Sequence, residues 1–283
     1  MMKMRTPVFA PHASITERVW HYLLRVLCAL LLLFLLLPIL VIIPLSFSDS
    51  TLLLYPIPAF SMKWYHALFE SDAWMRAAKN SFIVAPSATV IATILGTLAA
   101  VGLHRSSFMG KSMLMAILIS PMIVPLVVVG VGIYLFYAPY GVTSSYTGLI
   151  LAHAALGAPF VVTTVLATLQ VFDDNLLRAS YSLGANPLRA FFTVTLPIIA
   201  PGVISGALFA FATSFDEVVV TLFLAGPEQV TLPRQMFTGI RENISPIIAA
   251  VATILIVFST ALLLVLEWLR GRGEMAASAK HRQ

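Results

Sequence analysis

The chain has 283 residues, of which 59% are hydrophobic and only 10% are charged. An average soluble domain is roughly 25% charged, so this composition excludes an ordinary soluble enzyme. It also excludes disorder, which requires low hydrophobicity and high charge. The net charge of +5 does not by itself indicate a nucleic-acid partner, because basic residues of membrane proteins gather in cytoplasmic loops. The single cysteine, Cys28, excludes a disulfide framework and a four-cysteine zinc site.

Six stretches are long enough and poor enough in charge to cross a bilayer, which takes about 20 apolar residues per helix. They are residues 26–47, 82–103, 113–137, 147–171, 198–215 and 247–266, and none contains Lys, Arg, Asp or Glu. Backbone in hydrocarbon must satisfy its own hydrogen bonds, so each stretch is predicted to be a helix. The fold class is therefore all-α, a polytopic membrane protein with six spans in residues 26–268.

The first span follows a basic N-terminal segment, residues 1–25, which resembles the start of a signal peptide. Its apolar core is too long for a typical signal, and no clear cleavage site follows, so we interpret it as an uncleaved helix. Basic residues then predict the orientation: twelve lie on the side of the two termini and five on the other side. The positive-inside rule puts residues 1–25 and the tail, residues 269–283, in the cytoplasm.

Residues 48–80 form the longest predicted external segment. Its Trp64, Tyr65, Leu68, Phe69 and Trp74 recur at roughly helical spacing. This pattern is typical of an amphipathic helix at the outer interface, where aromatic rings are favoured. A packed external loop is compatible with the same residues.

Few residues in the sequence suggest a catalytic, nucleotide-binding or metal-binding role. Gly110, Lys111 and Ser112 match the end of a phosphate-binding loop, but Arg105 occupies the place of its first glycine. The chain is therefore not expected to hydrolyse ATP. The histidines lack metal-ligand spacing, so no metal site is predicted. His153, in the fourth span, is either a helix-packing residue with a satisfied hydrogen bond or a polar contact in a pathway.

The cytoplasmic loop between the fourth and fifth spans, residues 173–197, is more organised than the others. Asp173 or Asp174 is suited to cap a helix with one semi-apolar face, and Gly184 is suited to end it in the left-handed conformation. Asn186 and Pro187 predict the cap and first residue of a second helix, which Pro197 is expected to stop at the membrane. An exposed apolar face requires a partner groove, although a simple cytosolic connector is the alternative interpretation.

This loop resembles the EAA loop of ABC-importer permeases, whose pattern is E-A-A-x-x-x-G followed by Leu-Pro. The matching positions are Arg178, Ala179, Ser180, Gly184, Leu196 and Pro197. The resemblance covers most of the chain, and residues 214–221, 225–227 and 231–233 are most similar to the spermidine/putrescine branch. Iron, sulfate, opine and phosphonate importers have related permeases. Arg178 replaces the family glutamate and Ser180 replaces its second alanine, so the contact made by that glutamate is altered here.

The resemblance implies a type I importer fold and a non-catalytic subunit that binds no cofactor itself. Its implied partners are an ATPase dimer that holds ATP and Mg, a second permease subunit and a periplasmic substrate-binding protein. The loop, including Asn186 and Pro187, would couple to the ATPase. An ion-driven secondary transporter is the alternative class, but no internal repeat supports it.

Asp216 and Glu217 end the fifth span beside further apolar sequence, where ionisable groups often line a pathway. They are candidates to contact a passing cation such as a polyamine. The alternative is that they cap a helix end and bond to the backbone or to Arg234.

Overall fold

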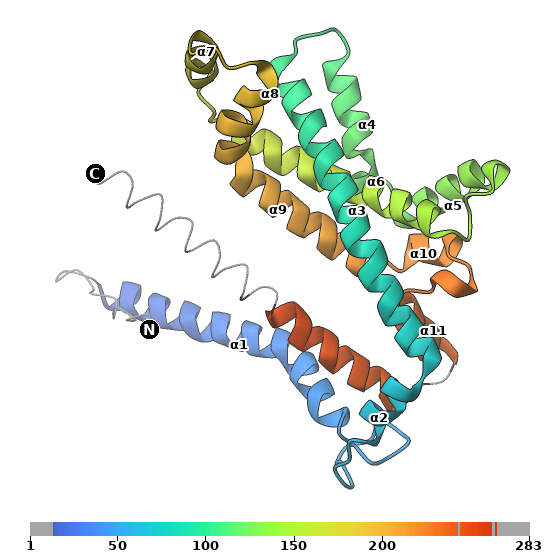
Figure 1. Ribbon diagram of the computed structural model, residues 1–283. Coiled ribbons are helices and arrows are strands. Elements are labelled where there is room, and N and C mark those ends of the chain that lie inside the picture. Colours follow the sequence, from blue (N-terminus) through green and yellow to red (C-terminus); the bar gives the residue numbers. More distant parts are fainter. Residues whose placement is uncertain (1–13, 243, 262–263, 265–283) are drawn as a thin grey trace. The chain divides into compact units, whose positions relative to one another are not determined.

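The computed structural model describes residues 14–242, 244–261 and 264, and over them the chain is helical apart from its connections (Figure 1). It divides into two compact units, residues 1–68 with 244–283 and residues 69–243. The predicted tail, residues 269–283, lies outside the described residues.

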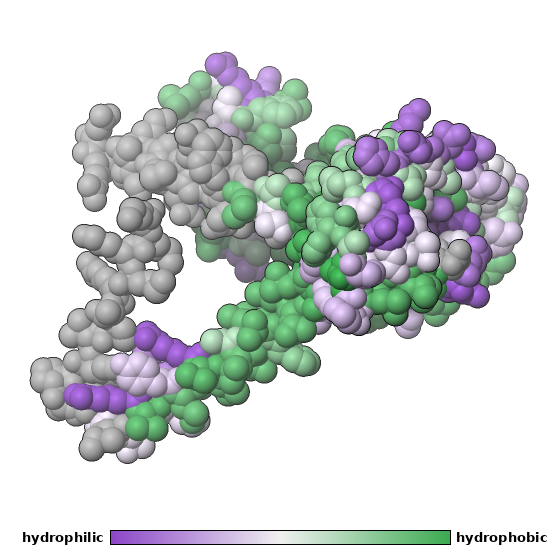
Figure 2. Space-filling model, turned by 90° about the horizontal axis from the view of Figure 1, so that it is seen from below, coloured by the Kyte–Doolittle hydropathy of each residue, from purple (hydrophilic) through white to green (hydrophobic). Residues whose placement is uncertain are grey.

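The first unit contains α1 (Ile15–Leu45) and an apolar helix, Pro246–Ala261. Helix α1 begins eleven residues before the predicted span because Ser14 and Glu17 form a capping box: the Ser14 hydroxyl accepts from the Glu17 N–H, and the Glu17 carboxylate accepts from the Ser14 N–H. The helix presents a continuous hydrophobic surface in the space-filling view (Figure 2). Such a surface is typical of a helix that faces lipid.

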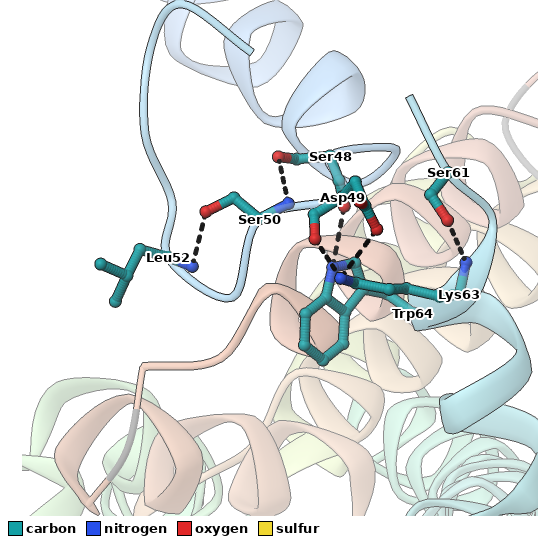
Figure 3. Close-up of polar contacts among 7 residues, drawn as sticks. All are labelled: Ser48, Asp49, Ser50, Leu52, Ser61, Lys63 and Trp64. Carbon is teal, nitrogen blue, oxygen red and sulfur yellow. Dashed lines mark hydrogen bonds and ion pairs between the residues drawn. The ribbon is translucent and has the colours of Figure 1, made fainter. Parts of the chain in front are cut away.

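A short polar network follows α1. Lys63 pairs with Asp49 at 2.8 Å, and Trp64 Nε1 donates to the Ser48 carbonyl at 2.9 Å (Figure 3). The predicted amphipathic helix is shorter than its aromatic pattern. Helix α2 (Lys63–Glu70) contains Trp64, Tyr65, Leu68 and Phe69, whereas Trp74 is buried in the next helix.

The second unit is built on three long helices, α3 (Asp72–Arg105), α6 (Tyr146–Leu169) and α9 (Leu196–Phe215). These helices pack on one another and form the core of the unit (Figure 1). Small residues make the packing close: a Cβ on Gly206 of α9 would lie 2.7 Å from Val161 Cα of α6. The close approach of α9 to α6 therefore depends on glycine at this position.

The third predicted span is not one straight helix. It forms α4 (Lys111–Ile123) and α5 (Leu126–Tyr137), which are bent by 110°. Pro125 lacks an N–H and disfavours helical backbone at Val124, which is extended with ψ 136°. The break therefore follows from a proline inside the predicted span.

Shorter elements complete the unit. They are the 3₁₀ turns η1 (Ala138–Tyr140) and η3 (Pro227–Gln229), the π-helix η2 (Phe191–Thr195), and the helices α7 (Asp174–Ser182), α8 (Pro187–Ala190), α10 (Val219–Leu224) and α11 (Leu232–Glu242).

Within the described residues, four helices are long and apolar enough to cross a membrane, or five if α4 and α5 form one broken span. Helix Pro246–Ala261 is apolar but shorter, and most of its predicted extension to residue 266 lies outside the described residues. The count of six crossings stays a prediction.

Candidate functional site

The loop of residues 173–197 has the predicted helix–turn–helix form. The Asp173 side chain accepts from the Asn175 N–H at 2.9 Å and caps α7. Gly184 ends this helix at φ +82°, with its N–H bonded to the Tyr181 carbonyl. The Ala185 N–H reaches back to the Ser180 carbonyl at 3.0 Å, which completes a Schellman motif. Local capping therefore defines this turn.

The second helix begins as predicted, because Asn186 Oδ1 accepts from the Arg189 N–H at 2.8 Å and Pro187 occupies the first position. The prediction that Pro197 stops this helix is wrong. The chain continues through the π-helix η2 into α9, so residues Pro187–Phe215 form one helix of 29 residues. The Leu196 N–H bonds to the Phe191 carbonyl, five residues back, and this wider turn precedes the proline.

Several apolar side chains are exposed on α7, in its turn and on α8. Leu177 and Ser180 are buried against the unit, whereas Leu183 is 89% and Leu188 is 70% exposed. Leu176 and Tyr181 are also exposed, and Figure 1 shows α7 at the end of the unit. Arg178 and Ala179 are exposed on the same helix. Arg178, which replaces the family glutamate, is thus available to a partner.

Arg105, at the end of α3, donates a hydrogen bond to Thr195 Oγ1 of η2 at 3.3 Å. Thr195 is fully buried. This contact attaches α3 to the helix that continues from the loop, and sequence reasoning missed it because the two residues lie 90 positions apart.

His153 joins three elements in the interior of the bundle. Its Nδ1 lies 2.9 Å from Ser214 Oγ of α9, and its Nε2 lies 3.1 Å from Thr221 Oγ1 of α10. All three side chains are buried. In this structure His153 is a packing residue whose two nitrogens both have a partner, which agrees with the first of its two predicted interpretations.

The two acidic candidates differ in environment. Glu217 is buried, and its Oε1 accepts from the Val220 N–H at 2.6 Å, at the start of α10. Asp216 is exposed, and no ion pair or hydrogen bond to its carboxylate occurs among the described residues. Arg234 donates to the Ala225 and Thr221 carbonyls, and among the described residues it makes no ion pair with either carboxylate. Glu217 therefore caps a helix, and Asp216 is free to meet a ligand.

A second group of hydrogen bonds, centred on Asn80, holds the connection before α11. Asn80 Nδ2 donates to the Glu228 and Val230 carbonyls, both at 2.8 Å, and Tyr146 donates to Asn80 Oδ1 at 2.6 Å. Asn80 is buried. Asn80 lies two residues before the second apolar run, and nothing in the sequence indicated its distant partners.

The site thus consists of a capped helical loop at one end of the unit and an exposed carboxylate after the long helix that continues from it. These features, on a bundle of apolar helices, define an integral-membrane permease. The profile of the family described as "Binding-protein-dependent transport system inner membrane component" matches residues 92–272. The chain belongs to this family.

Two relatives agree with this assignment. The spermidine/putrescine transport system permease protein PotC of Haemophilus influenzae is 33% identical over 82% of this chain and 90% of its own length. The putrescine transport system permease protein PotI of Escherichia coli is 34% identical over 79% of this chain and 82% of its own length.

A solved bacterial ABC transporter that imports the acidic polysaccharide alginate has a chain with the same fold. The two chains superpose with a TM-score of 0.74 at 16% identity, and the match covers 92% of this chain and 99% of that chain. The fold class predicted from the sequence is confirmed. The chain is a multi-pass permease of the inner membrane, a subunit for transport rather than an enzyme.

Proposed function

We propose that this chain is the permease subunit of an ATP-driven importer that moves polyamines of the spermidine or putrescine type. The substrates named for the two relatives, spermidine and putrescine, support this substrate class. The exposed carboxylate of Asp216 supports it physically, because an ammonium group that leaves water needs a charged or polar partner. Glu217 has a different role here, since it is buried and caps α10.

Residues 173–197, the coupling segment, dock into a separate ATPase dimer that binds ATP and Mg. The main support is the continuity of the second half of this segment with α9, which makes Pro187–Phe215 a single lever from the docking surface to Asp216. The exposed Leu183 and Leu188 supply apolar contact area, and Arg178 supplies a positive charge where the family has a glutamate. The ATPase groove that accepts this loop should therefore be less basic at this position than a groove that accepts the family glutamate.

A second permease subunit and a periplasmic substrate-binding protein complete the transporter, and both termini of this chain face the cytoplasm. ATP closes the ATPase dimer and moves the coupling segment, and the bundle changes from inward to outward facing. ATP must bind one of these states more tightly than the other, since a ligand shifts an equilibrium only by its difference in affinity.

The test is uptake by the assembled transporter in proteoliposomes. Spermidine, putrescine, amino acids, iron and sulfate compete for the uptake of labelled putrescine, with ATP inside and the binding protein outside. Competition by the two polyamines alone, and only with ATP, supports the proposal. Preference for another solute would retire the acidic pathway, and uptake driven by a proton gradient without the ATPase would identify a secondary transporter.

A further inference from the structure

The connection between α1 and α2 carries a run of apolar residues that pack into no core. Leu52, Leu53, Leu54 and Tyr55 are 59%, 38%, 51% and 55% exposed. They lie outside every predicted span, in a segment that would otherwise be in water. Four consecutive exposed apolar residues are unfavourable in water, and such runs usually mark a contact surface.

The base of this loop is closed by polar and backbone contacts. The Asp49 N–H bonds to the Ala59 carbonyl at 2.9 Å, and the Ser61 N–H bonds to the Phe47 carbonyl at 2.6 Å. The ion pair of Lys63 with Asp49 lies beside them and stays partly exposed. Figure 3 shows Leu52 pointing away from this polar cluster. The loop therefore has a fixed polar base and an apolar tip.

One hydrogen bond sets the depth of the tip. The Tyr55 hydroxyl donates to the Val41 carbonyl of α1 at 3.1 Å. Val41 lies four residues before the end of α1, or about 6 Å back along its axis. The apolar part of α1, residues 26–45, is about 30 Å long, which matches the hydrocarbon thickness of a bilayer. Val41 thus lies inside the hydrocarbon boundary, and Tyr55 reaches down to it.

The chemistry of the contact fits this depth. A phenolic hydroxyl in a region without water needs a protein partner, and a helix carbonyl supplies one. Tyrosine is also favoured where apolar hydrocarbon meets polar headgroups. The charged pair Asp49–Lys63 stays on the polar side of the same boundary.

We propose that residues 52–55 dip into the lipid leaflet that surrounds the Leu45 end of α1, with lipid acyl chains as the occupant of this surface. A protein that approached from the aqueous phase would first meet the polar base at Asp49 and Lys63, not the apolar tip. The loop anchors the first helix at a fixed depth. This inference does not depend on the identity of the substrate or on the ATPase contact.

Fluorescence quenching in the assembled transporter tests the proposal. The native Cys28 is replaced by Ser, and a bimane label is attached at Leu53→Cys in nanodiscs that contain lipids with a doxyl group near the headgroup. Matched labels at Ser50→Cys and Leu35→Cys report the polar base and the middle of the apolar part of α1. We expect doxyl lipids to reduce the fluorescence at position 53 and aqueous iodide to leave it unchanged, with the opposite result at position 50.

Two results would overturn the proposal. Iodide quenching at position 53 equal to that at position 50 would put the tip in water, and protection from both quenchers would mean that another protein covers it. A label at Leu54→Cys repeats the measurement with a different side chain removed. Adding Tyr55→Phe to the Leu53→Cys variant removes only the hydroxyl, and we expect iodide access at position 53 to increase.

Discussion

The Nε2 of His153 lies 3.1 Å from Thr221 Oγ1, so one imidazole ring attaches α10 to α6 inside the bundle. The same ring contacts Ser214, near the end of the helix that begins in the coupling segment. The Thr221 hydroxyl in turn donates to the Glu217 carbonyl at 3.2 Å. These hydrogen bonds connect the end of α9 to the turn that carries Asp216.

Replacing His153 by Ala is expected to weaken this connection. Interhelical hydrogen bonds in membrane proteins contribute about 0.6 kcal/mol each, so the loss of two should lower thermal stability only modestly. The transport rate should fall clearly even though the thermal midpoint changes little, because Ser214 and Thr221 lose their common partner. Transport rate and thermal midpoint of the reconstituted complex are measured together. Thr253→Val is the matched control, since among the described residues the buried Thr253 hydroxyl bonds only to the Ala249 carbonyl of its own helix. A control that reduced uptake equally would assign the effect to general packing.

Gly184→Val should uncouple ATP hydrolysis from uptake. Gly184 has φ +82°, where a β-branched residue is strained by roughly 1–2 kcal/mol. The turn between α7 and α8 would distort, and the ratio of ATP hydrolysed to polyamine transported should rise. Gly110→Val is the control, because Gly110 has φ +101° in a different loop and also has open space around it. Gly184→Asn should restore much of the coupling, since Asn tolerates this conformation. Normal coupling in Gly184→Val would contradict the proposed role of the turn.

Asp216→Asn and Glu217→Gln remove the same charge from adjacent residues with different environments. We expect Asp216→Asn to raise the half-saturating polyamine concentration about tenfold, which corresponds to roughly 1.4 kcal/mol. Glu217→Gln should change it little, because the amide oxygen can still accept from the Val220 N–H. Glu217→Ala removes that cap and should cost about 1 kcal/mol of stability. Uptake kinetics at several substrate concentrations distinguish the three variants, and equal kinetics for Asp216→Asn and wild type would remove Asp216 from the pathway.

Gly206→Ala should destabilise the bundle. The added Cβ would lie 2.5 Å from Thr164 Oγ1 and 2.7 Å from Val161 Cα, and backbone must move to make room. Overpacking of this kind costs typically about 1–3 kcal/mol. Thermal unfolding of the purified complex provides the measurement. Gly132→Ala should leave the midpoint unchanged, because among the described residues no side chain or other helix lies within 4 Å of the added Cβ.

The parts of the structure that depend on neighbouring residues could be predicted from the sequence. The caps at Asp173 and Asn186 and the left-handed turn at Gly184 were predicted correctly, because each depends on residues no more than five positions away. The long apolar runs likewise predicted helices, since hydrocarbon leaves the backbone few alternatives.

The prolines were harder to interpret. Pro125 breaks a predicted span, whereas Pro197 does not stop a predicted helix. The difference arises because the π-helix before Pro197 widens the preceding turn, while Val124 adopts an extended backbone. A proline in sequence specifies a missing hydrogen bond but does not determine which of these two adjustments the chain makes.

Contacts between distant elements had no sequence signal. His153 was recognised as a polar residue in a span, yet its partners lie 61 and 68 residues away and depend on how α6, α9 and α10 pack. The same holds for Asn80, whose two acceptors are about 150 residues distant. The different burial of Asp216 and Glu217 is set by the N-terminus of α10, which the apolar sequence after them did not reveal.

The unbroken helix from Pro187 to Phe215 has a consequence for how this chain can vary in length. An inserted or deleted residue in a helix rotates everything beyond it by about 100°, because each turn contains 3.6 residues. Such a change between Asn186 and Ser214 would turn Ser214 away from the imidazole. Length variation among homologous permeases should therefore be concentrated in the connections, such as the one that follows α1, and be absent from this stretch.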